Sequence, residues 1–470
     1  MGVQSSKARE AEPKLFVAWL DRHYISMVAI FVLLVYMLTY LARPFGDPIR
    51  ADGAGYYAYL PSLLLYGDPS FETDANAHYG GAFPTWTYVR RYPPTGRYLN
   101  ALNIGVSLMA SPFFLVAHTL TWWFGWPWED GPAWMKMRFP PDGYSLFYQH
   151  GAGLAGVFYF LLGFAILKNL LGKVFPRGVV LFTLTALLLG TNLLFYSASD
   201  TVNAHAYTFF LTALLMWLTS KWYEQPASWR WGAGLGTVLA LLVLVRPLNF
   251  FLWLWFPLYG MRNHRDAAAR VRVYGRNWRT LVVAAVVASA WMIPQMLLWK
   301  AASGHFIVRA YQHMDVSSFG APHLLGVLFG AHKGLFIWFP LFLFVVLGSF
   351  FMKEKAAPLR LPWLGLFTGY LLIISMYRIW TSAGGFGNRY VVDLVFPAAF
   401  PLASLFETAF RSRWKWFIGL ATMACILWVV FLLTLQYRRE IGWEGTDIKG
   451  LLDVFWWRKE LIINVLHSLR

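Results

Sequence analysis

The apolar run SMVAIFVLLVYMLTYLA, residues 26–42, is followed within ten residues by IRADGAGYYAYLPSLLLYGD, residues 49–68. An uncharged run of about 17 residues is the shortest that spans the hydrocarbon core of a bilayer. Asp52 therefore stands just beyond the end of a membrane span, ahead of a Tyr-rich segment that fits a short helix at the membrane surface. This order predicts a membrane protein with a carboxylate at the membrane boundary.

The composition of the chain indicates many spans. Its 470 residues are 58% hydrophobic and only 13% charged, with a mean hydropathy of +0.48, values typical of a polytopic membrane protein. The 25 Trp and 24 Tyr residues suit both bilayer interfaces. The single cysteine, Cys425, excludes an intrachain disulfide and a thiolate metal cluster.

Eleven apolar runs are long enough to be spans. They lie near residues 26–42, 150–170, 178–197, 203–220, 231–245, 247–261, 280–299, 334–351, 362–379, 391–410 and 415–433. A twelfth, 99–125, is also long enough, but Ser111-Pro112 is expected to break it. We therefore expect an all-α bundle of about 11–13 transmembrane helices.

Basic residues predict the orientation. With the N-terminus inside and segment 99–125 not crossing, the N-terminal tail and five short inner loops hold 21 of the 40 Lys and Arg residues but 6 of the 23 acids, as the positive-inside rule requires. Segment 99–125 is then re-entrant or lies along the outer leaflet. The expected domains are a cytoplasmic tail (1–22), a transmembrane domain (23–433) whose first outer loop is 43–149, and an outer C-terminal tail (434–470). The net charge of +17 does not indicate nucleic-acid binding, because the basic residues are divided among these loops.

Two acids on the outer side are candidates for chemistry. Asp52 is either a catalytic carboxylate or the N-cap of the helix that follows it. Asp200 lies in a very short turn between two spans, where a charge is costly, and it too either acts in chemistry or caps the next helix. His205 nearby is a ligand-binding candidate, or else it packs against Tyr207.

Cations gather on the same side. Arg91 and Arg97 flank a stiff Pro93-Pro94 turn, and guanidinium groups bind phosphate through paired hydrogen bonds. Arg246, Lys333 and Arg389 lie at span ends, where each cation needs an anion, a carbonyl group or water. The bland alternative for all five is anchoring at the membrane interface. We predict that Arg91, Arg246, Lys333 and Arg389 form one site for a lipid phosphate.

Other signals are weak or absent. GAGLAG, residues 151–156, lies in an apolar span with no strand before it, so it indicates helix packing and not a dinucleotide-binding loop. His313 and Asp315 are two metal-ligand types in one loop, which is a weak indication of a metal site.

The order of these motifs resembles the GT-C superfamily of membrane glycosyltransferases, and within it the protein mannosyltransferase and aminoarabinose transferase group. The similar segments are Asp52 with Tyr56 (D-x-x-x-Y), Arg91 before Pro-Pro (K-P-P in the family), SDTVNAHAYTFFLTAL, HKGLFIWFP and GGFGNRY. The resemblance implies a GT-C-like bundle with interfacial helices in the first outer loop. It also implies an inverting transfer of sugar from a polyprenyl-phosphate donor to a glycan, lipid or protein acceptor of the cell envelope.

The resemblance assigns Asp52 as the catalytic carboxylate, Asp200 as the second acid and Arg91 to the place of the family's Lys before Pro-Pro. The predicted substrate-binding residues are Tyr56, Arg91, Arg97, His205, Arg246, Lys333 and Arg389. Gly53 follows Asp52 where the family often has a second acid, so a divalent metal ion is left open as a cofactor. The bacterial inner membrane is the expected location, with the active site facing the periplasm or exterior. The competing class is a transporter or flippase of a lipid-linked saccharide, which would need charges deep inside several spans.

Overall fold

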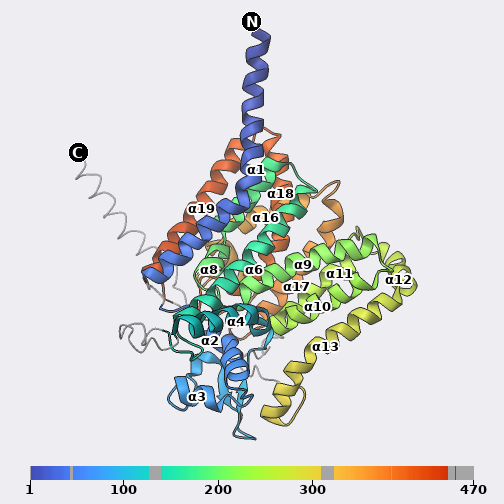
Figure 1. Ribbon diagram of the computed structural model, residues 1–470. Coiled ribbons are helices and arrows are strands. Elements are labelled where there is room, and N and C mark those ends of the chain that lie inside the picture. The colour runs from blue at the N-terminus through green and yellow to red at the C-terminus, as the bar shows by residue number, and fades with distance from the viewer. Residues whose placement is uncertain are drawn as a thin grey trace, which may run out of the picture. The chain divides into compact units, whose positions relative to one another are not determined.

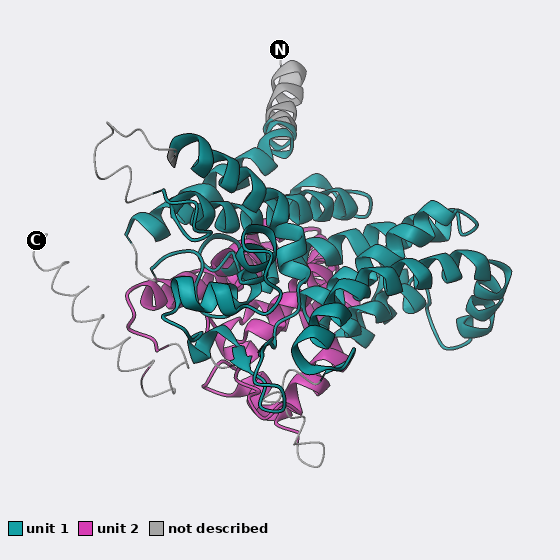
Figure 2. Ribbon diagram, turned by 60° about the horizontal axis from the view of Figure 1, so that its bottom comes forward, with its two compact units in different colours: residues 1–181, 196–312, 353–366 teal, residues 182–195, 313–352, 367–470 magenta. Residues whose placement is uncertain are grey.

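The computed structural model describes residues 2–42, 46–125, 139–308, 322–382, 384–442 and 450, with side chains from residue 16 onward. Almost all of its regular structure is helical (Figure 1). The chain divides into two compact units (Figure 2): unit 1 is residues 1–181, 196–312 and 353–366, and unit 2 is residues 182–195, 313–352 and 367–470.

Unit 1 contains most of the elements. They are α1 (Gly2–Leu41), α2 (Asp52–Tyr57), η1 (Pro61–Leu65), α3 (Glu72–His78), η2 (Thr85–Thr87), β1 (Val89–Arg91), β2 (Tyr98–Asn100), α4 (Gly105–Gly125), α6 (Leu146–Gly172), α9 (Ala204–Glu224), α10 (Trp229–Val245), η3 (Pro247–Leu254), α11 (Trp255–Leu258), α12 (Asp266–Arg276), α13 (Trp278–Ser303) and η5 (Ala357–Leu359). Unit 2 contains α14 (Leu324–Phe329), α15 (Leu335–Trp338), α16 (Leu341–Gly348), η4 (Ser349–Phe351), η6 (Arg389–Val391), α18 (Val392–Phe410) and α19 (Lys415–Tyr437). The helices α7 (Arg177–Gly190), α8 (Leu193–Ala198) and α17 (Arg360–Ser375) contribute residues to both units.

Seven helical segments of the described chain are long and apolar enough to cross a membrane. They are Phe16–Leu41, Gly105–Phe124, Leu146–Gly172, Trp278–Ser303, Ala357–Ser375, Arg389–Phe410 and Lys415–Tyr437. Shorter apolar helices cover Arg177–Gly190, Trp229–Val245, Pro247–Leu258 and Leu341–Phe351. All eleven predicted runs overlap one of these helices or α9, so the prediction of a helical, polytopic membrane protein is confirmed. The number of 11–13 spans stays a prediction, because only seven of the described helical segments are long and apolar enough to cross a membrane.

Glycines let α6 pack closely on the start of α9. A Cβ at Gly156 would collide with the carbonyl oxygen of Thr201, and one at Gly163 would lie 2.9 Å from Cα of Phe210. Because the contacts advance along both helices together, α6 and α9 run in the same direction. The interpretation of GAGLAG as a helix-packing segment is therefore confirmed.

The end of α10 lies at the same end of this helix group as the start of α9. Asn249, just after α10, donates from its side-chain amide to the Thr208 hydroxyl at 2.9 Å. The end of α1 joins them, because the Tyr36 hydroxyl lies 3.0 Å from His150 Nδ1 near the start of α6. This end of unit 1, where α1 and α10 end and α6 and α9 begin, is called the Asp52 end below.

The predicted break in segment 99–125 is wrong, because α4 is one continuous helix through Pro112. Proline has no N–H to offer to the carbonyl of Leu108, four residues earlier. The Ser111 hydroxyl donates to that carbonyl oxygen instead, at 2.8 Å. The Ser-Pro pair thus supplies its own replacement hydrogen bond, and the helix continues.

Both ends of α4 lie at the Asp52 end. Its first residue, Gly105, contacts the backbone of Val245 at the end of α10. Near its other end, His118 Nδ1 lies 2.6 Å from the hydroxyl of Tyr148 at the start of α6. The placement of this segment relative to a membrane remains a prediction.

Two details add to these expectations. The N-terminal segment belongs to α1, which is a single helix from Gly2 to Leu41 and whose apolar part starts at Phe16. A small antiparallel hairpin of β1 and β2, in which Arg91 pairs with Tyr98, accompanies the helices. The predicted division into a tail (1–22), a transmembrane domain and a C-terminal tail stays a prediction, and most of the C-terminal tail lies outside the described residues.

The close approach of α6 to Thr201 can be tested by adding one methyl group. We expect Gly156→Ala to lower the free energy of unfolding by about 1–3 kcal/mol, because the new Cβ meets a backbone oxygen that a side-chain rotation cannot move. Thermal and denaturant unfolding of the purified protein in detergent would measure the change.

Gly178→Ala in α7 is the matched control, because nothing lies within 4 Å of its added Cβ. That variant should be as stable as the parent or slightly more so, since alanine is the better helix former. Equal stability of Gly156→Ala and Gly178→Ala would contradict the packing described for α6.

Candidate functional site

Asp52 is the first residue of α2, and it is partly exposed while the rest of that helix is buried. The N-cap position belongs to Ala51, and no side chain caps the helix. Ala51 has φ = +46°, a backbone conformation that is rare for a residue with a Cβ. Asp52 is therefore not the N-cap, and it adjoins a strained residue of the kind that clusters at functional sites.

The turn at Asp200 packs directly on the Asp52 segment. Gly53 is in van der Waals contact with Val202, since a Cβ on Gly53 would lie 3.2 Å from Cβ of Val202. The Arg50 guanidinium donates to the carbonyl oxygen of Ser199. Because these contacts join residues 50–53 to residues 199–202, the structure brings the segments that carry the two predicted acids side by side.

Asp200 does not cap the following helix. The N-cap of α9 is Asn203, whose side chain accepts from the Ala204 N–H at 2.7 Å. The same Asn203 donates from Nδ2 to Asp200 Oδ2 at 3.2 Å. The Asp200 carboxylate is thus oriented by the residue that starts α9, at the edge of solvent.

Two predicted substrate-binding residues near these acids are buried. His205 is 2% exposed and packs on Tyr196 with the two rings tilted and their centroids 4.5 Å apart, whereas the alternative partner, Tyr207, contacts Tyr159. Tyr56 is 3% exposed, and its carbonyl oxygen accepts from the Ser107 hydroxyl. Both side chains take part in the packing of the Asp52 end.

Arg91 already has an acidic partner. Its guanidinium donates to Glu72 through two hydrogen bonds, Nη1 to Oε1 at 2.8 Å and Nη2 to Oε2 at 3.0 Å, and it lies over the Tyr98 ring. The hydrogen bonds that Arg91 donates to Glu72 raise the pKa of the guanidinium. Arg91 thus has an acidic partner within the chain, and its role in binding substrate stays a prediction.

Arg97 and Arg246 differ in their surroundings. Arg97 is exposed and donates from Nη1 to the Ala301 carbonyl oxygen at the end of α13, at 2.7 Å. Arg246 directly follows α10 and is only 6% exposed. Arg246 therefore places a buried cation at the Asp52 end, next to the start of α4.

The other two predicted cations belong to unit 2. Lys333 is fully buried, with φ = +68°, and Arg389 starts η6, which Asn388 caps with its side chain. A buried acid that the sequence did not single out, Asp393, follows Arg389 by four residues and accepts from the Tyr370 hydroxyl at 2.6 Å. A single phosphate site that joins Arg91 and Arg246 to Lys333 and Arg389 stays a prediction.

A second buried acid in unit 1 also escaped the sequence analysis. Asp74 in α3 is fully buried, and its Oδ2 accepts from the Tyr144 hydroxyl at 2.9 Å and from the Ser62 hydroxyl at 3.5 Å. The His78 ring lies 4.2 Å from the Tyr144 ring. No local sequence pattern predicts this cluster, because Tyr144 is 70 residues away from Asp74 in the chain.

Nothing in the described residues forms a metal centre. They contain no group of three or more His, Cys, Asp or Glu side chains placed to hold an ion. His313 and Asp315 lie outside the described residues.

Comparisons with known proteins gave a likeness in structure only. No protein-family model and no curated protein matches the sequence. The chain is similar to an archaeal oligosaccharyltransferase, AglB from Archaeoglobus fulgidus, solved with an inhibitory peptide and a dolichol-phosphate: the identity is 11%, the TM-score is 0.48, and the match covers 94% of this chain and 58% of that one. The chain is also similar to an Archaeoglobus fulgidus oligosaccharyltransferase in the apo form. The identity is 14%, the TM-score is 0.42, and the match covers 89% of this chain and 55% of that one. The chain thus spans little more than half the length of these proteins.

The Asp74 cluster makes a clear prediction for pH dependence. Burial raises the pKa of Asp74 to about 7, whereas a carboxyl group in an unfolded chain has a pKa near ~3.9. Between these two values the folded state holds a proton that the unfolded state releases, so the free energy of unfolding falls as the pH rises from about 4 to 7. The loss is on the order of 4 kcal/mol.

Asp74→Asn should remove this loss, because the amide keeps an acceptor for Tyr144 and Ser62 and cannot ionise. We expect the variant to gain stability relative to the parent as the pH rises from 5 to 8, measured by denaturant unfolding at each pH. The pKa of His78 is lowered by its burial, but His78 is present in both proteins and its effect cancels in their difference. A parent-to-variant difference that does not change with pH would contradict the buried placement of Asp74.

Proposed function

We propose that this protein is a membrane glycosyltransferase that moves a sugar from a polyprenyl-phosphate donor to a glycan, lipid or protein acceptor. The observation that carries the proposal is the contact between the Asp52 segment and the Asp200 turn. It brings together two acid-bearing segments that lie about 150 residues apart in the chain, at one end of a group of apolar helices. In this proposal the Asp52 end faces the periplasm or the exterior.

The reaction needs a base, and Asp52 has the right setting for one. The acceptor hydroxyl attacks the anomeric carbon of the sugar, the new C–O bond forms there, and the bond between that carbon and the phosphate oxygen breaks. The hydroxyl proton passes to the Asp52 carboxylate, and the bonding electrons leave with the polyprenyl phosphate. Direct displacement of this kind inverts the anomeric centre. A partly exposed carboxylate on a buried helix is held in place yet open to an acceptor.

Asp200 is proposed to position the acceptor or the sugar. Its carboxylate is oriented by Asn203 and lies on the turn that touches Gly53. A second carboxylate can accept hydrogen bonds from sugar hydroxyls while Asp52 takes the proton. Tyr56 and His205 are proposed to support this region, since both are buried around it.

The departing phosphate needs positive charge. Arg246 is the proposed source of this charge in unit 1, because it is a buried cation at the Asp52 end. A guanidinium held away from water stabilises the charge that develops on a leaving phosphate more strongly than an exposed one. Arg97, Lys333 and Arg389 are further proposed donors to the same lipid phosphate.

A transporter of lipid-linked saccharides is the competing function. Charged side chains in the seven long apolar segments of the described chain, such as Asp21, Lys168, Lys300 and Asp393, lie near the segment ends and not in their middles. A transport path would need polar or charged groups at mid-membrane depth. This distribution favours chemistry at one membrane surface.

The first test removes the proposed base. Asp52→Asn should abolish sugar transfer while the melting temperature stays within a few degrees of the parent, because a partly exposed acid contributes little to folding. A strain lacking the gene, complemented with the parent or the variant, would be assayed by mass spectrometry of its envelope glycans.

Asp47→Asn is the matched control, since Asp47 is an exposed acid in the same loop. It should restore the glycans fully. Full restoration by Asp52→Asn as well would demote Asp52 to a structural residue.

The second test concerns the leaving phosphate. Arg246→Gln should weaken binding of a polyprenyl-phosphate donor analogue by about 1.5–3 kcal/mol for each hydrogen bond lost to the charged group, with a smaller effect on acceptor binding. Arg90→Gln serves as the control, because Arg90 is exposed and donates to the Thr85 carbonyl oxygen.

Arg246→Lys guards against misfolding in this experiment, since it keeps the buried charge but loses the planar donor pair. We expect it to bind the analogue with intermediate affinity. Donor binding by both Arg246 variants as tight as that of the parent would exclude Arg246 from the phosphate site.

A further inference from the structure

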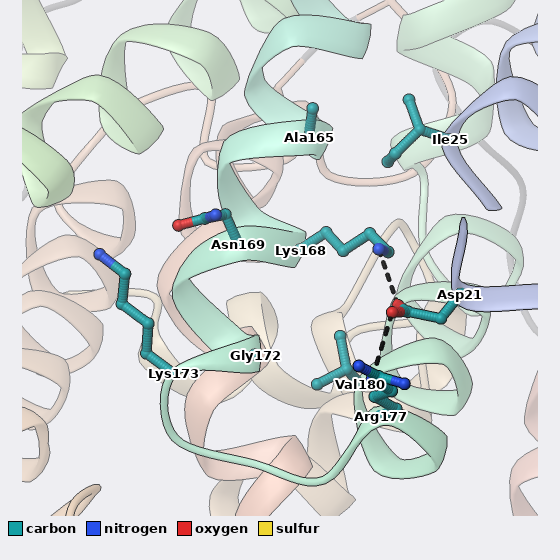
Figure 3. Close-up of a pocket in the computed structure, with 9 residues that line it drawn as sticks. All are labelled: Asp21, Ile25, Ala165, Lys168, Asn169, Gly172, Lys173, Arg177 and Val180. Carbon is teal, nitrogen blue, oxygen red and sulfur yellow. Dashed lines mark ion pairs between the residues drawn. The ribbon is translucent and has the colours of Figure 1, made fainter. Parts of the chain in front are cut away.

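A cavity of about 430 Å³ opens at the end of unit 1 opposite to Asp52 (Figure 3). It lies between the beginning of the apolar part of α1, the end of α6 and the start of α7. Its charged lining consists of Asp21, Lys168, Lys173 and Arg177. The proposed glycosyl transfer uses none of these residues.

The carboxylate in the cavity is shared by two cations. Lys168 Nζ lies 2.7 Å from Asp21 Oδ1, and Arg177 Nε lies 3.5 Å from Asp21 Oδ2. The Asp21 and Lys168 side chains are only 24% and 21% exposed, whereas Arg177 is 67% exposed. Asp21 therefore holds two donors in place but can neutralise only one of their charges.

Lys173 adds a third cation that this carboxylate does not engage. Figure 3 shows Lys168 directed toward Asp21, and Lys173 directed away from it. Among the described residues, no ion pair or side-chain hydrogen bond involves the Lys173 ammonium group. The cavity thus carries three cations against one carboxylate, and two positive charges remain for a ligand.

The cavity lies at the ends of two segments that are long and apolar enough to cross a membrane. Asp21 is in the first turns of the segment Phe16–Leu41, and Lys168 is in the last turns of Leu146–Gly172. Ile25, Ala165 and Val180 are the apolar side chains of the lining. Basic pockets between membrane helices at this level are suited to anionic lipid head groups.

We propose that this cavity binds the phosphate of an anionic phospholipid, with the lipid's acyl chain against its apolar wall. The phosphate accepts hydrogen bonds from Lys173 and Arg177, while Asp21 keeps Lys168 and Arg177 in position when no lipid is bound. A soluble phosphate compound offers the same charge but no group for the apolar wall. The lipid is for this reason the ligand that fits both sides of the cavity.

Lipid binding to the purified full chain in a neutral detergent tests this site. Native mass spectrometry would give the dissociation constants for phosphatidylglycerol and phosphatidylcholine. We expect phosphatidylglycerol to bind more tightly, and Lys173→Gln and Arg177→Gln each to weaken it about fivefold, the effect of one cation near an anionic surface. Arg230→Gln is the control, because Arg230 is an exposed arginine at a helix start outside the cavity, and it should leave the affinity unchanged. Equal affinities for the parent and all three variants would overturn the site.

A soluble competitor distinguishes the two sources of phosphate. Glycerophosphoglycerol is phosphatidylglycerol without its acyl chains and carries the same singly charged phosphodiester. We expect it to displace phosphatidylglycerol only at concentrations at least about a hundredfold higher than the lipid's own dissociation constant. Displacement at concentrations comparable to that constant would overturn the assignment to a lipid.

Asp21→Asn separates binding from a purely structural ion pair. Without the carboxylate, Lys168 and Arg177 repel each other, so the melting temperature should fall in phosphatidylcholine nanodiscs. Phosphatidylglycerol should restore it, because the lipid phosphate takes the place of the carboxylate. An equal fall in both lipids would show that the cluster only links α1 to α6 and α7, and would overturn the proposal.

Discussion

The Asp52 end depends on three places where a glycine lets two backbones meet. Gly156 of α6 contacts the Thr201 carbonyl oxygen, Gly53 contacts Val202, and Gly55 contacts the Thr87 carbonyl oxygen ahead of β1. Because a Cβ at any of these positions would push the partner away, the turn that carries Asp200 is held between α6 and α2, and the hairpin is held on the other side of α2. In an interior packed this closely, one element cannot move without moving the others. The position of Asp52 is therefore determined by the packing of the helices around it and not by the conformation of its own loop.

Features that rest on local composition could be predicted from the sequence, and features that rest on a distant partner could not. The apolar runs predicted the helices because a backbone in hydrocarbon must satisfy its own hydrogen bonds, which needs no knowledge of neighbours. The prediction of a helix break at Pro112 was wrong, because the Ser111 hydroxyl donates the hydrogen bond to the Leu108 carbonyl oxygen that proline cannot donate. The partner of Arg91 is Glu72, 19 residues earlier, and that pairing exists only because the hairpin folds back beside α3. Asp74 looks like any helical acid in the sequence, and only Tyr144 and Ser62 make it a buried one.

Cations at the two ends of unit 1 meet different conditions. At the Asp52 end, Arg91 and Arg97 are exposed and already bound to Glu72 and to a helix carbonyl group, so their charges are largely satisfied. Exposed pairs of this kind contribute little to stability, and they serve here to fix the hairpin. At the other end Lys168 and Arg177 share the single carboxylate of Asp21. Each of the two hairpin arginines thus has its own acceptor, whereas the cations around Asp21 outnumber the carboxylate beside them.

The backbone at Ala51 links packing to chemistry. A positive φ on a residue with a Cβ costs about 1–3 kcal/mol and persists only where its neighbours over-determine it. Here the chain is fixed on both sides of Ala51, at Arg50 by its hydrogen bond to the Ser199 carbonyl oxygen and at Gly53, two residues later, by Val202. Relaxing Ala51 would break one of these contacts and turn the start of α2, so the two contacts hold the start of α2 beside the Asp200 turn. A helix that needed only a cap would begin with a relaxed residue whose side chain accepts from its first N–H groups. Here the first position is instead a partly exposed carboxylate that follows a strained residue.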